Sequence, residues 1–264
     1  MRVAAEGEVE IPMPDLQSGT AIVTGASGGI GEAAAKRFAE EGANVVVADI
    51  KVEEGEATVA DIADAGGEAT FVETDVSDPD DVAAMVETAV DTYGGLDYAF
   101  NNAGIEGERG ATADQPLDNW ERVIDINLKG VFLGMRAEIP AMLEDGGGAI
   151  VNTSSIAGQV AFADISPYVA SKHGVIGLTK NAAVEYSREG VRVNAICPGV
   201  IETPMVARSG EENPEMMEQV SAATPIGRIG QPEEIGDAAV WLCSEEASFV
   251  TGEAMTIDGG YVSQ

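Results

Sequence analysis

Short, uniformly apolar runs alternate with segments of helical periodicity from residue 20 to residue 257. Continuous apolar runs are typical of strands buried on both faces, whereas half-exposed strands alternate in polarity. Regular alternation of such strands with helices favours a parallel sheet that helices cover on both faces. The sequence therefore predicts an α/β fold, a single domain with a doubly wound parallel sheet of seven strands. The predicted strands lie at 20–24, 44–49, 69–74, 96–100, 148–153, 191–197 and 254–257.

The segments between these runs carry the start and stop signals of helices. Asp78 and Ser166 are each predicted to cap a helix whose first position is a proline. Gly190 is predicted to end the second of these helices, and we expect a break before Pro140 inside a long helix. The predicted helices cover 30–41, 53–65, 78–93, 117–142, 166–190 and 232–243.

The chain is predicted to hold one domain, at 19–264, preceded by a polar N-terminal extension at 1–18. Its opening lacks a basic segment followed by an apolar run, and no stretch approaches the roughly 20 apolar residues that span a bilayer. We therefore expect a soluble cytoplasmic protein. Cys197 and Cys243 lie in no metal-binding spacing, so buried reduced thiols are favoured and no metal is expected. The longest irregular region, Val200–Gln231, predicts a lid or a substrate loop.

The charge of the chain is strongly negative. Aspartate and glutamate total 46 and lysine and arginine 14, which gives a formal net charge of −32. Self-repulsion on this scale destabilises a compact state at low salt, and molar salt screens it. The acids are spread along the chain, whereas a patch for a basic partner would concentrate them. The composition indicates adaptation to molar salt, as in a halophile, and it disfavours nucleic acid as a partner.

A glycine-rich turn, TGASGGIG, lies between the first predicted strand and the first predicted helix, with spaced glycines at Gly25, Gly29 and Gly31. Such a turn lets the backbone approach a pyrophosphate, to which the helix N-terminus directs free N–H groups. Asp49 closes the second strand, where a carboxylate can bind both ribose hydroxyls of an adenosine and repel a 2′-phosphate. Lys51 is the only nearby cation that could bind a 2′-phosphate. The sequence therefore predicts NAD rather than NADP as the cofactor.

Tyr168 and Lys172 are four residues apart inside a predicted helix, so their side chains share one face. An ammonium beside a phenol favours the phenolate and lowers the phenol pKa, which suits the tyrosine to general acid/base catalysis. Ser154 and Ser155 end the fifth predicted strand at its carboxyl edge, where open α/β sheets bind ligands. One of these hydroxyls is placed to hold a substrate oxygen near Tyr168, and the other is expected to cap a turn.

Further motifs follow the glycine-rich turn in a fixed order: TDV at 74–76, NNAG at 101–104, INLKG around Asn127, NTSS at 152–155, YVASK at 168–172, CPGVIETPM at 197–205 and IDGG at 257–260. Together they resemble the compact type of the short-chain dehydrogenase/reductase family. The resemblance covers about 19–260, nearly the whole chain, and leaves the N-terminal segment outside. It implies a single Rossmann domain.

By this resemblance, Tyr168 is the catalytic acid/base, and Lys172 lowers its pKa while binding the nicotinamide ribose. Ser155, thirteen residues before the tyrosine, would hold the substrate oxygen, which leaves Ser154 as its structural neighbour. Asn127 would anchor a water in a proton relay to the lysine. The implied cofactor contacts are Gly25, Ser27, Gly29, Ile30, Gly31, Asp49, Ile50, Asp75, Val76, Asn102, Ala103, Gly104, Tyr168, Lys172, Pro198, Gly199, Ile201 and Thr203.

These observations predict an NAD-dependent oxidoreductase that interconverts a secondary alcohol and a ketone by hydride transfer. Gln159, Phe162 and Met205, with Ser155, are predicted to line the substrate. A glucose 1-dehydrogenase-like enzyme and a 3-oxoacyl thioester reductase stay open, as does an NAD-binding sensor or scaffold without turnover. The resemblance also implies a homotetramer, and the expected partner is a small-molecule alcohol or ketone, with no nucleic acid or membrane.

Overall fold

The computed structural model describes residues 16, 18–204, 206 and 214–264, and its seven strands form one parallel sheet. The strands lie in the order β3-β2-β1-β4-β5-β6-β7, so the winding direction reverses between β1 and β4. This confirms the predicted fold class. The strands are β1 Thr20–Thr24, β2 Asn44–Asp49, β3 Glu68–Glu73, β4 Tyr98–Asn101, β5 Gly148–Thr153, β6 Val191–Pro198 and β7 Ala254–Ile257.

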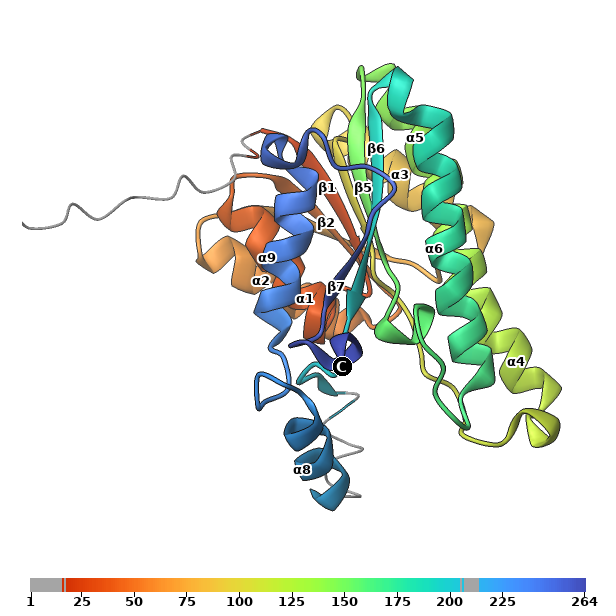
Figure 1. Cartoon of the computed structure of the whole chain (residues 1–264). Helices are drawn as coiled ribbons and strands as arrows, with labels where there is room; N and C mark the ends of the chain where they lie inside the picture. The colour runs from red at the N-terminus through yellow and green to blue at the C-terminus, as the bar shows by residue number, and fades with distance from the viewer. Residues whose placement is uncertain (1–15, 17, 205, 207–213) are drawn as a thin grey trace, which may run out of the picture.

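Helices cover both faces of the sheet (Figure 1). One face carries α1 Gly29–Glu40, α2 Val52–Asp64 and α9 Pro232–Cys243. The other face carries α3 Pro79–Tyr93, α5 Gly130–Glu144 and α6 Ser166–Tyr186. Two shorter helices, α4 Leu117–Ile124 and α8 Pro214–Ala223, lie at the end of the molecule where β6 ends (Figure 1).

Several helix boundaries follow from local capping, of which the sequence predicts the cap at Asp78. The Asp78 carboxylate accepts the Asp80 N–H at 2.8 Å, which caps α3 as expected. Gly94 ends α3 with a left-handed φ of 96°. Gln231 and Glu234 form a reciprocal capping box at the start of α9, in which the Glu234 carboxylate accepts the Gln231 N–H at 2.8 Å.

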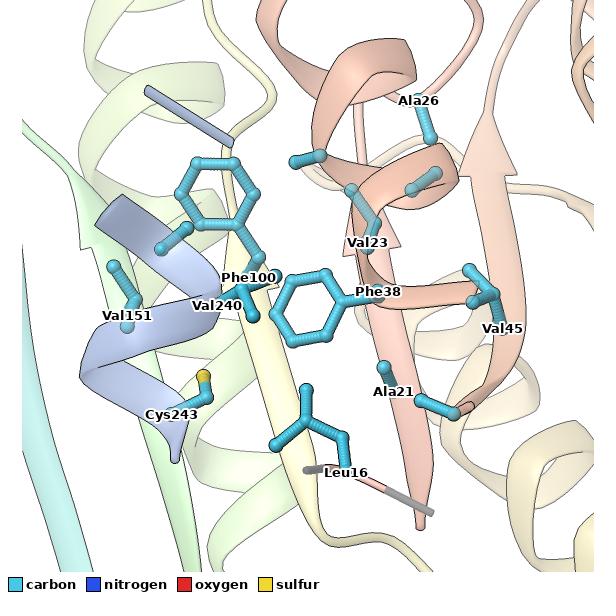
Figure 2. Packing of buried hydrophobic residues seen from close by; sticks show 14 of the residues in the cluster. Leu16, Ala21, Val23, Ala26, Phe38, Val45, Phe100, Val151, Val240 and Cys243 are labelled. Atoms are coloured by element: carbon cyan, nitrogen blue, oxygen red, sulfur yellow. The ribbon is translucent and has the colours of Figure 1, made fainter. Parts of the chain in front are cut away.

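The core on the α1 face is built around Phe38 (Figure 2). Phe38 is fully buried and lies among Val23, Phe100 and Val240, which come from two strands and α9. Burying a side chain of this size contributes about 1.5–3 kcal/mol. Leu16 is 1% exposed and joins the same cluster, although the predicted domain begins at residue 19.

The expected break before Pro140 is wrong, because α5 continues through it to Glu144. A proline inside a helix removes one N–H and leaves the carbonyl four residues earlier without its helical partner. Pro140 and Arg136 both lie on the exposed side of α5, so water can bind that carbonyl. Because the carbonyl of Arg136 is on the solvent side, the helix can continue past Pro140.

Ser166 does not cap α6 as predicted, since it is the first helical residue and Ile165 occupies the capping position. Ile165 pairs with Gly110 in an isolated β-bridge, and its carbonyl accepts the Val169 N–H at 3.0 Å. Contact with a distant loop thus starts the helix one residue earlier. Gly190 ends the segment after α6 in the left-handed region, as expected.

The long region Val200–Gln231 is less irregular than expected. It contains α8, and a bridge between Ile201 and Gly230 closes its base. Residues 205 and 207–213 lie outside the described residues, so the predicted lid or substrate loop stays a prediction.

Several predicted features concern the chain as a whole. Cys197 and Cys243 are both buried free thiols that form no disulfide. Within the described ranges, no three metal-ligating side chains cluster and no helix is long and apolar enough to cross a bilayer. The division of the chain into an extension at 1–18 and one domain stays a prediction.

Candidate active site

The glycine-rich turn between β1 and α1 is shaped by contacts that only glycine allows. Gly25 and Gly29 have φ of +67° and +56°, in the left-handed region. A Cβ on Gly31 would collide with the Gly25 carbonyl oxygen, and one on Gly25 would lie 2.9 Å from the Ala103 Cα. The helix begins after Gly28, which has no side chain to cap it. The turn therefore leaves backbone N–H groups at a helix N-terminus, which suits an anion.

Asp49, at the end of β2, is tied directly to this turn. Its carboxylate accepts the Ser27 N–H at 3.1 Å and the Lys51 N–H at 3.1 Å. Beside it, the Ile50 side chain is 63% exposed. The carboxylate predicted to meet a ribose thus lies at the edge of the predicted phosphate cradle.

The NNAG segment after β4 forms the floor next to the glycine turn. The Thr24 hydroxyl accepts the N–H groups of Asn102 and Ala103, at 2.9 and 3.1 Å. The Asn102 amide donates back to the Thr24 carbonyl at 3.1 Å. A Cβ on Gly104 would lie 3.2 Å from Asn127 Oδ1, so the helix segment that carries Asn127 approaches this floor closely.

Asn127 is fully buried in a π-helical turn, Asp125–Lys129, that joins α4 and α5. Its Oδ1 accepts the Ile105 N–H and its Nδ2 donates to the Ile105 carbonyl, both at 2.8 Å. Its Nδ2 also lies 3.2 Å from the Ser171 hydroxyl. A π-turn inside a helix often occurs at functional sites, and here it brings Asn127 against the loop after β4.

Tyr168, Lys172 and Ser155 meet where β5 ends beside α6. Lys172 Nζ donates to the Thr153 carbonyl at 2.8 Å and lies 5.5 Å from the centroid of the Tyr168 ring. Ser155 begins the turn after β5, and its Oγ accepts the Ala157 N–H at 3.1 Å. The buried Ser154 hydroxyl donates to the Lys172 carbonyl at 2.9 Å, so the serine that caps the turn is Ser155 and not Ser154.

The electrostatics of this cluster differ from the expectation. Burial raises the pKa of Tyr168 to about 12, the Ser155 hydroxyl opposes this rise, and the charge of Glu106 adds to it. Burial also lowers the pKa of Lys172 to about 8. The sequence predicts a phenol pKa lowered by Lys172, whereas in the structure burial dominates and the ammonium donates to Thr153 instead.

The segment after β6 closes the other side of the site. The Gly199 N–H donates to the Ile257 carbonyl at 2.9 Å and continues the pairing of Pro198 with β7. A Cβ on Gly29 would lie 3.2 Å from the Thr203 side chain, so Thr203 covers the glycine turn. The predicted cofactor residues after β1, β2, β4 and β6 therefore gather at one edge of the sheet.

The residues after β3 that are predicted to contact the cofactor are Asp75 and Val76. Asp75 is exposed, and its carboxylate accepts the N–H and the hydroxyl of Ser77 at 2.9 and 2.7 Å. A Cβ on Gly130 would lie 3.0 Å from the Val76 side chain, so α5 packs closely against Val76.

The predicted substrate residues have partners of their own. The Gln159 amide exchanges hydrogen bonds with the Thr256 hydroxyl at 2.9 and 3.0 Å. Phe162 stacks on Tyr261 with ring centroids 6.4 Å apart. Met205 lies outside the described residues.

Three residues of this site have roles that the sequence does not predict. Thr24 holds the NNAG floor, Thr153 accepts the Lys172 ammonium, and Glu106 lies near Tyr168. The available signal for Thr24 and Thr153 is that each ends a strand and lies in one of the quoted motifs, TGASGGIG or NTSS. Glu106 follows NNAG by only two residues but matches no motif.

Comparison with known proteins shows which family the chain belongs to. A family model described as "Enoyl-(Acyl carrier protein) reductase" matches residues 25–262. The cyclohexanol dehydrogenase of Acinetobacter sp. (strain SE19) is 48% identical over 244 residues, 92% of this chain and 95% of that protein. The chain belongs to the short-chain dehydrogenase/reductase family. Members of this family of oxidoreductases use NAD or NADP.

Two further members show how this short-chain dehydrogenase/reductase compares in sequence and in fold. The 2,5-dichloro-2,5-cyclohexadiene-1,4-diol dehydrogenase of Sphingobium indicum (strain DSM 16412 / CCM 7286 / MTCC 6364 / B90A) is 44% identical over 252 residues, 95% of this chain and all of that protein. The crystal structure of levodione reductase aligns with a TM-score of 0.91 at 38% identity, over 94% of this chain and 98% of that one.

A buried polar network lies behind the site of this short-chain dehydrogenase/reductase. Asn101 Nδ2 donates to Glu138 Oε2 at 2.9 Å and to Asn152 Oδ1 at 3.1 Å. The Asn152 amide donates to the Thr179 hydroxyl at 3.0 Å. Glu138 is fully buried, and its Oε1 has no hydrogen-bond partner among the described residues. The network links α5 and α6 to the strands that carry the NNAG floor and Ser155.

Proposed function

We propose that the protein is an NAD-dependent oxidoreductase that interconverts a secondary alcohol, of a cyclic kind, and the matching ketone. The observation that carries this proposal is the meeting of Asn127, Ser155, Tyr168 and Lys172 beside the glycine-rich turn. The names of the related cyclohexanol and cyclohexadienediol dehydrogenases favour a ring-shaped alcohol. The test measures nicotinamide absorbance while the protein is incubated with NAD and cyclohexanol in molar KCl. If folded protein turned over none of the cyclic alcohols offered, the proposal would be contradicted.

The residues present fit a dinucleotide. The glycine turn is a cradle that a Cβ would fill, and it lies beside the Asp49 carboxylate. We assign the pyrophosphate to the turn, the adenosine ribose to Asp49 and the nicotinamide end to Pro198, Gly199, Ile201 and Thr203. When bound, the cofactor supplies the hydride acceptor or donor.

The protein's own residues transfer the proton. Because the pKa of Tyr168 is about 12, its phenol is protonated near neutral pH and can donate a proton to a ketone oxygen. In the oxidative direction, the deprotonated form of Tyr168, the phenolate, takes the hydroxyl proton of the alcohol. Ser155 holds the substrate oxygen beside the phenol. Asn127 fixes the loop at Ile105, and Lys172 lies between that loop and Tyr168.

Replacing Asp49 by asparagine is expected to shift the preference from NAD towards NADP. Asparagine keeps an oxygen that can accept the Ser27 N–H but removes the charge that repels a 2′-phosphate. We expect the ratio of kcat/KM for NADP over NAD to rise at least about tenfold, which is about 1.4 kcal/mol. Asp64→Asn, at the end of α2, is the matched control. An unchanged ratio in Asp49→Asn would remove Asp49 from cofactor selection.

We propose that the acidic composition adapts the protein to molar salt. With a formal net charge of −32, raising KCl from about 0.1 M to about 1 M shortens the Debye length from about 10 Å to about 3 Å and screens the self-repulsion. The midpoint of thermal unfolding is therefore expected to rise with KCl. A midpoint that stays constant or falls over this range would contradict salt adaptation.

We also propose a homotetramer in the cytoplasm, formed by the domain at 19–264. Phe132 on α5 is 48% exposed and Val184 on α6 is 85% exposed, and these apolar side chains favour contact with another copy. Analytical ultracentrifugation in molar KCl measures the number of copies.

A further inference from the structure

The loop that follows β4 is held at two points along the rim of the site. At its start, Asn127 binds both the N–H and the carbonyl of Ile105, each at 2.8 Å. Further along, the buried Asn119 side chain accepts the Glu108 N–H at 2.9 Å. Glu106 lies between these two attachments, so the backbone that carries its carboxylate is fixed.

The far end of the same loop is bound to the segment that leads into Tyr168. The Gly110 N–H donates to the Asp164 carbonyl at 2.8 Å, and Gly110 pairs with Ile165 in a β-bridge. Gln115 Nε2 donates to the Gly110 carbonyl at 2.7 Å and to the Asp164 carbonyl at 3.3 Å. The loop therefore runs from the Lys172 ammonium, which lies 3.5 Å from a Cβ placed on Gly104, to the start of α6, and Glu106 lies within it.

The charge that Glu106 brings to this rim is only partly compensated. Its Oε1 forms an ion pair with Arg109 Nη2 at 2.6 Å, and the Arg109 side chain is 56% exposed whereas that of Glu106 is 29% exposed. The cation therefore points more towards solvent and the carboxylate more towards the protein. In keeping with this, the Glu106 charge raises the pKa of the Tyr168 phenol.

We propose that Glu106 is a specificity residue that excludes alcohols and ketones bearing a carboxylate near the reacting carbon and favours neutral ones. This role rests on the proposed function, because it assumes that the substrate oxygen is held between Ser155 and Tyr168. A negative charge on the substrate ring would then face the Glu106 carboxylate at a partly buried site, where water screens it poorly. Repulsion of like charges is an established route to specificity.

The test compares cyclohexanol with cis-2-hydroxycyclohexanecarboxylate, which has the same ring and a carboxylate on the carbon next to the reacting one. In Glu106→Gln, the ratio of kcat/KM for the carboxylate over cyclohexanol is expected to rise roughly tenfold, mostly through a lower KM for the carboxylate. Arg109→Gln exposes the Glu106 charge and is expected to lower the same ratio. Glu108→Gln removes an exposed acid from the same loop and serves as the matched control.

The outcomes separate this proposal from the proposed function. Turnover of cyclohexanol by the wild-type protein reports the proposed function, and the ratio reports Glu106. A ratio that is unchanged in Glu106→Gln, or that rises equally in Glu108→Gln, would overturn the role of Glu106. If the protein turned over neither compound, absorbance titration of the phenols would decide. The component that Tyr168→Phe removes should then titrate at lower pH in Glu106→Gln, and an unshifted component would overturn the proposal.

Discussion

Replacing Tyr168 by phenylalanine is expected to lower kcat by roughly three orders of magnitude, within the 10²- to 10⁴-fold range of general acid–base catalysis. Phenylalanine keeps the ring beside Lys172 but removes the only atom of this side chain that exchanges a proton. Both directions should be affected, because the same side chain donates the proton as the phenol in reduction and accepts it as the phenolate in oxidation. Initial rates of cyclohexanol oxidation and cyclohexanone reduction, in molar KCl, measure the effect.

Tyr93→Phe is the matched control for this loss. It removes a phenol that hydrogen-bonds to Thr70 at 2.8 Å on β3, away from the site, and it should leave kcat near the wild-type value. Thermal unfolding of both variants checks that they fold. If folded Tyr168→Phe kept kcat within about tenfold of the wild type, Tyr168 would not be the acid/base and another proton donor would have to be sought.

Replacing Glu138 by glutamine is expected to flatten the pH dependence of stability. Burial raises the pKa of Glu138 from 4.5 to about 7, although the hydrogen bond from Asn101 opposes the rise. An acid with a raised folded-state pKa contributes stability that is fully present below its unfolded pKa and is lost as the pH rises through about 7. At 1.36 kcal/mol per pKa unit, the loss from about pH 5 to about pH 8 is about 2–3 kcal/mol.

Denaturant unfolding at about pH 5 and about pH 8, in molar KCl, measures this difference. The wild-type free energy of unfolding should fall between the two pH values by about 2–3 kcal/mol more than that of Glu138→Gln. Glu144→Gln, on the last residue of the same helix, controls for general loss of negative charge and should follow the wild type. The comparison holds even if glutamine destabilises the protein at both pH values. Equal pH dependence of Glu138→Gln and the wild type would show that the buried acid does not titrate in this range.

Much of the fold could be predicted from the sequence because its signals are local. Strands buried on both faces need continuous apolar runs, and the predicted strands at 20–24, 44–49 and 148–153 coincide with β1, β2 and β5. The N-cap at Asp78 also depends only on neighbouring residues. Expectations failed where distant contacts or exposure decide, as in the bridge from Ile165 to Gly110 and the water-facing side of α5 at Pro140.

The candidate site also has features that the sequence predicts and features that it does not. Gly25, Asp49 and Tyr168 could be chosen from the sequence, because each type of residue is required at a fixed place relative to a strand end or a helix turn. The burial and the neighbours of these residues could not be predicted from the sequence. The pKa of Tyr168 depends on burial, and the ammonium expected to lower it donates to Thr153. Glu106 belongs to no motif, and only the folding of its loop against the start of α6 brings it to the rim.

The sequence by itself determined the order of strands and helices, the glycine turn and the types of residue available for proton transfer. These properties depend on periodicity, backbone freedom and chemistry, which are present in a short stretch of chain. Only the tertiary structure decided the charge state and the neighbours of those residues, including the network around Glu138 and the position of Glu106. Burial and long-range hydrogen bonds set both, and they arise only when segments far apart in the sequence are packed together.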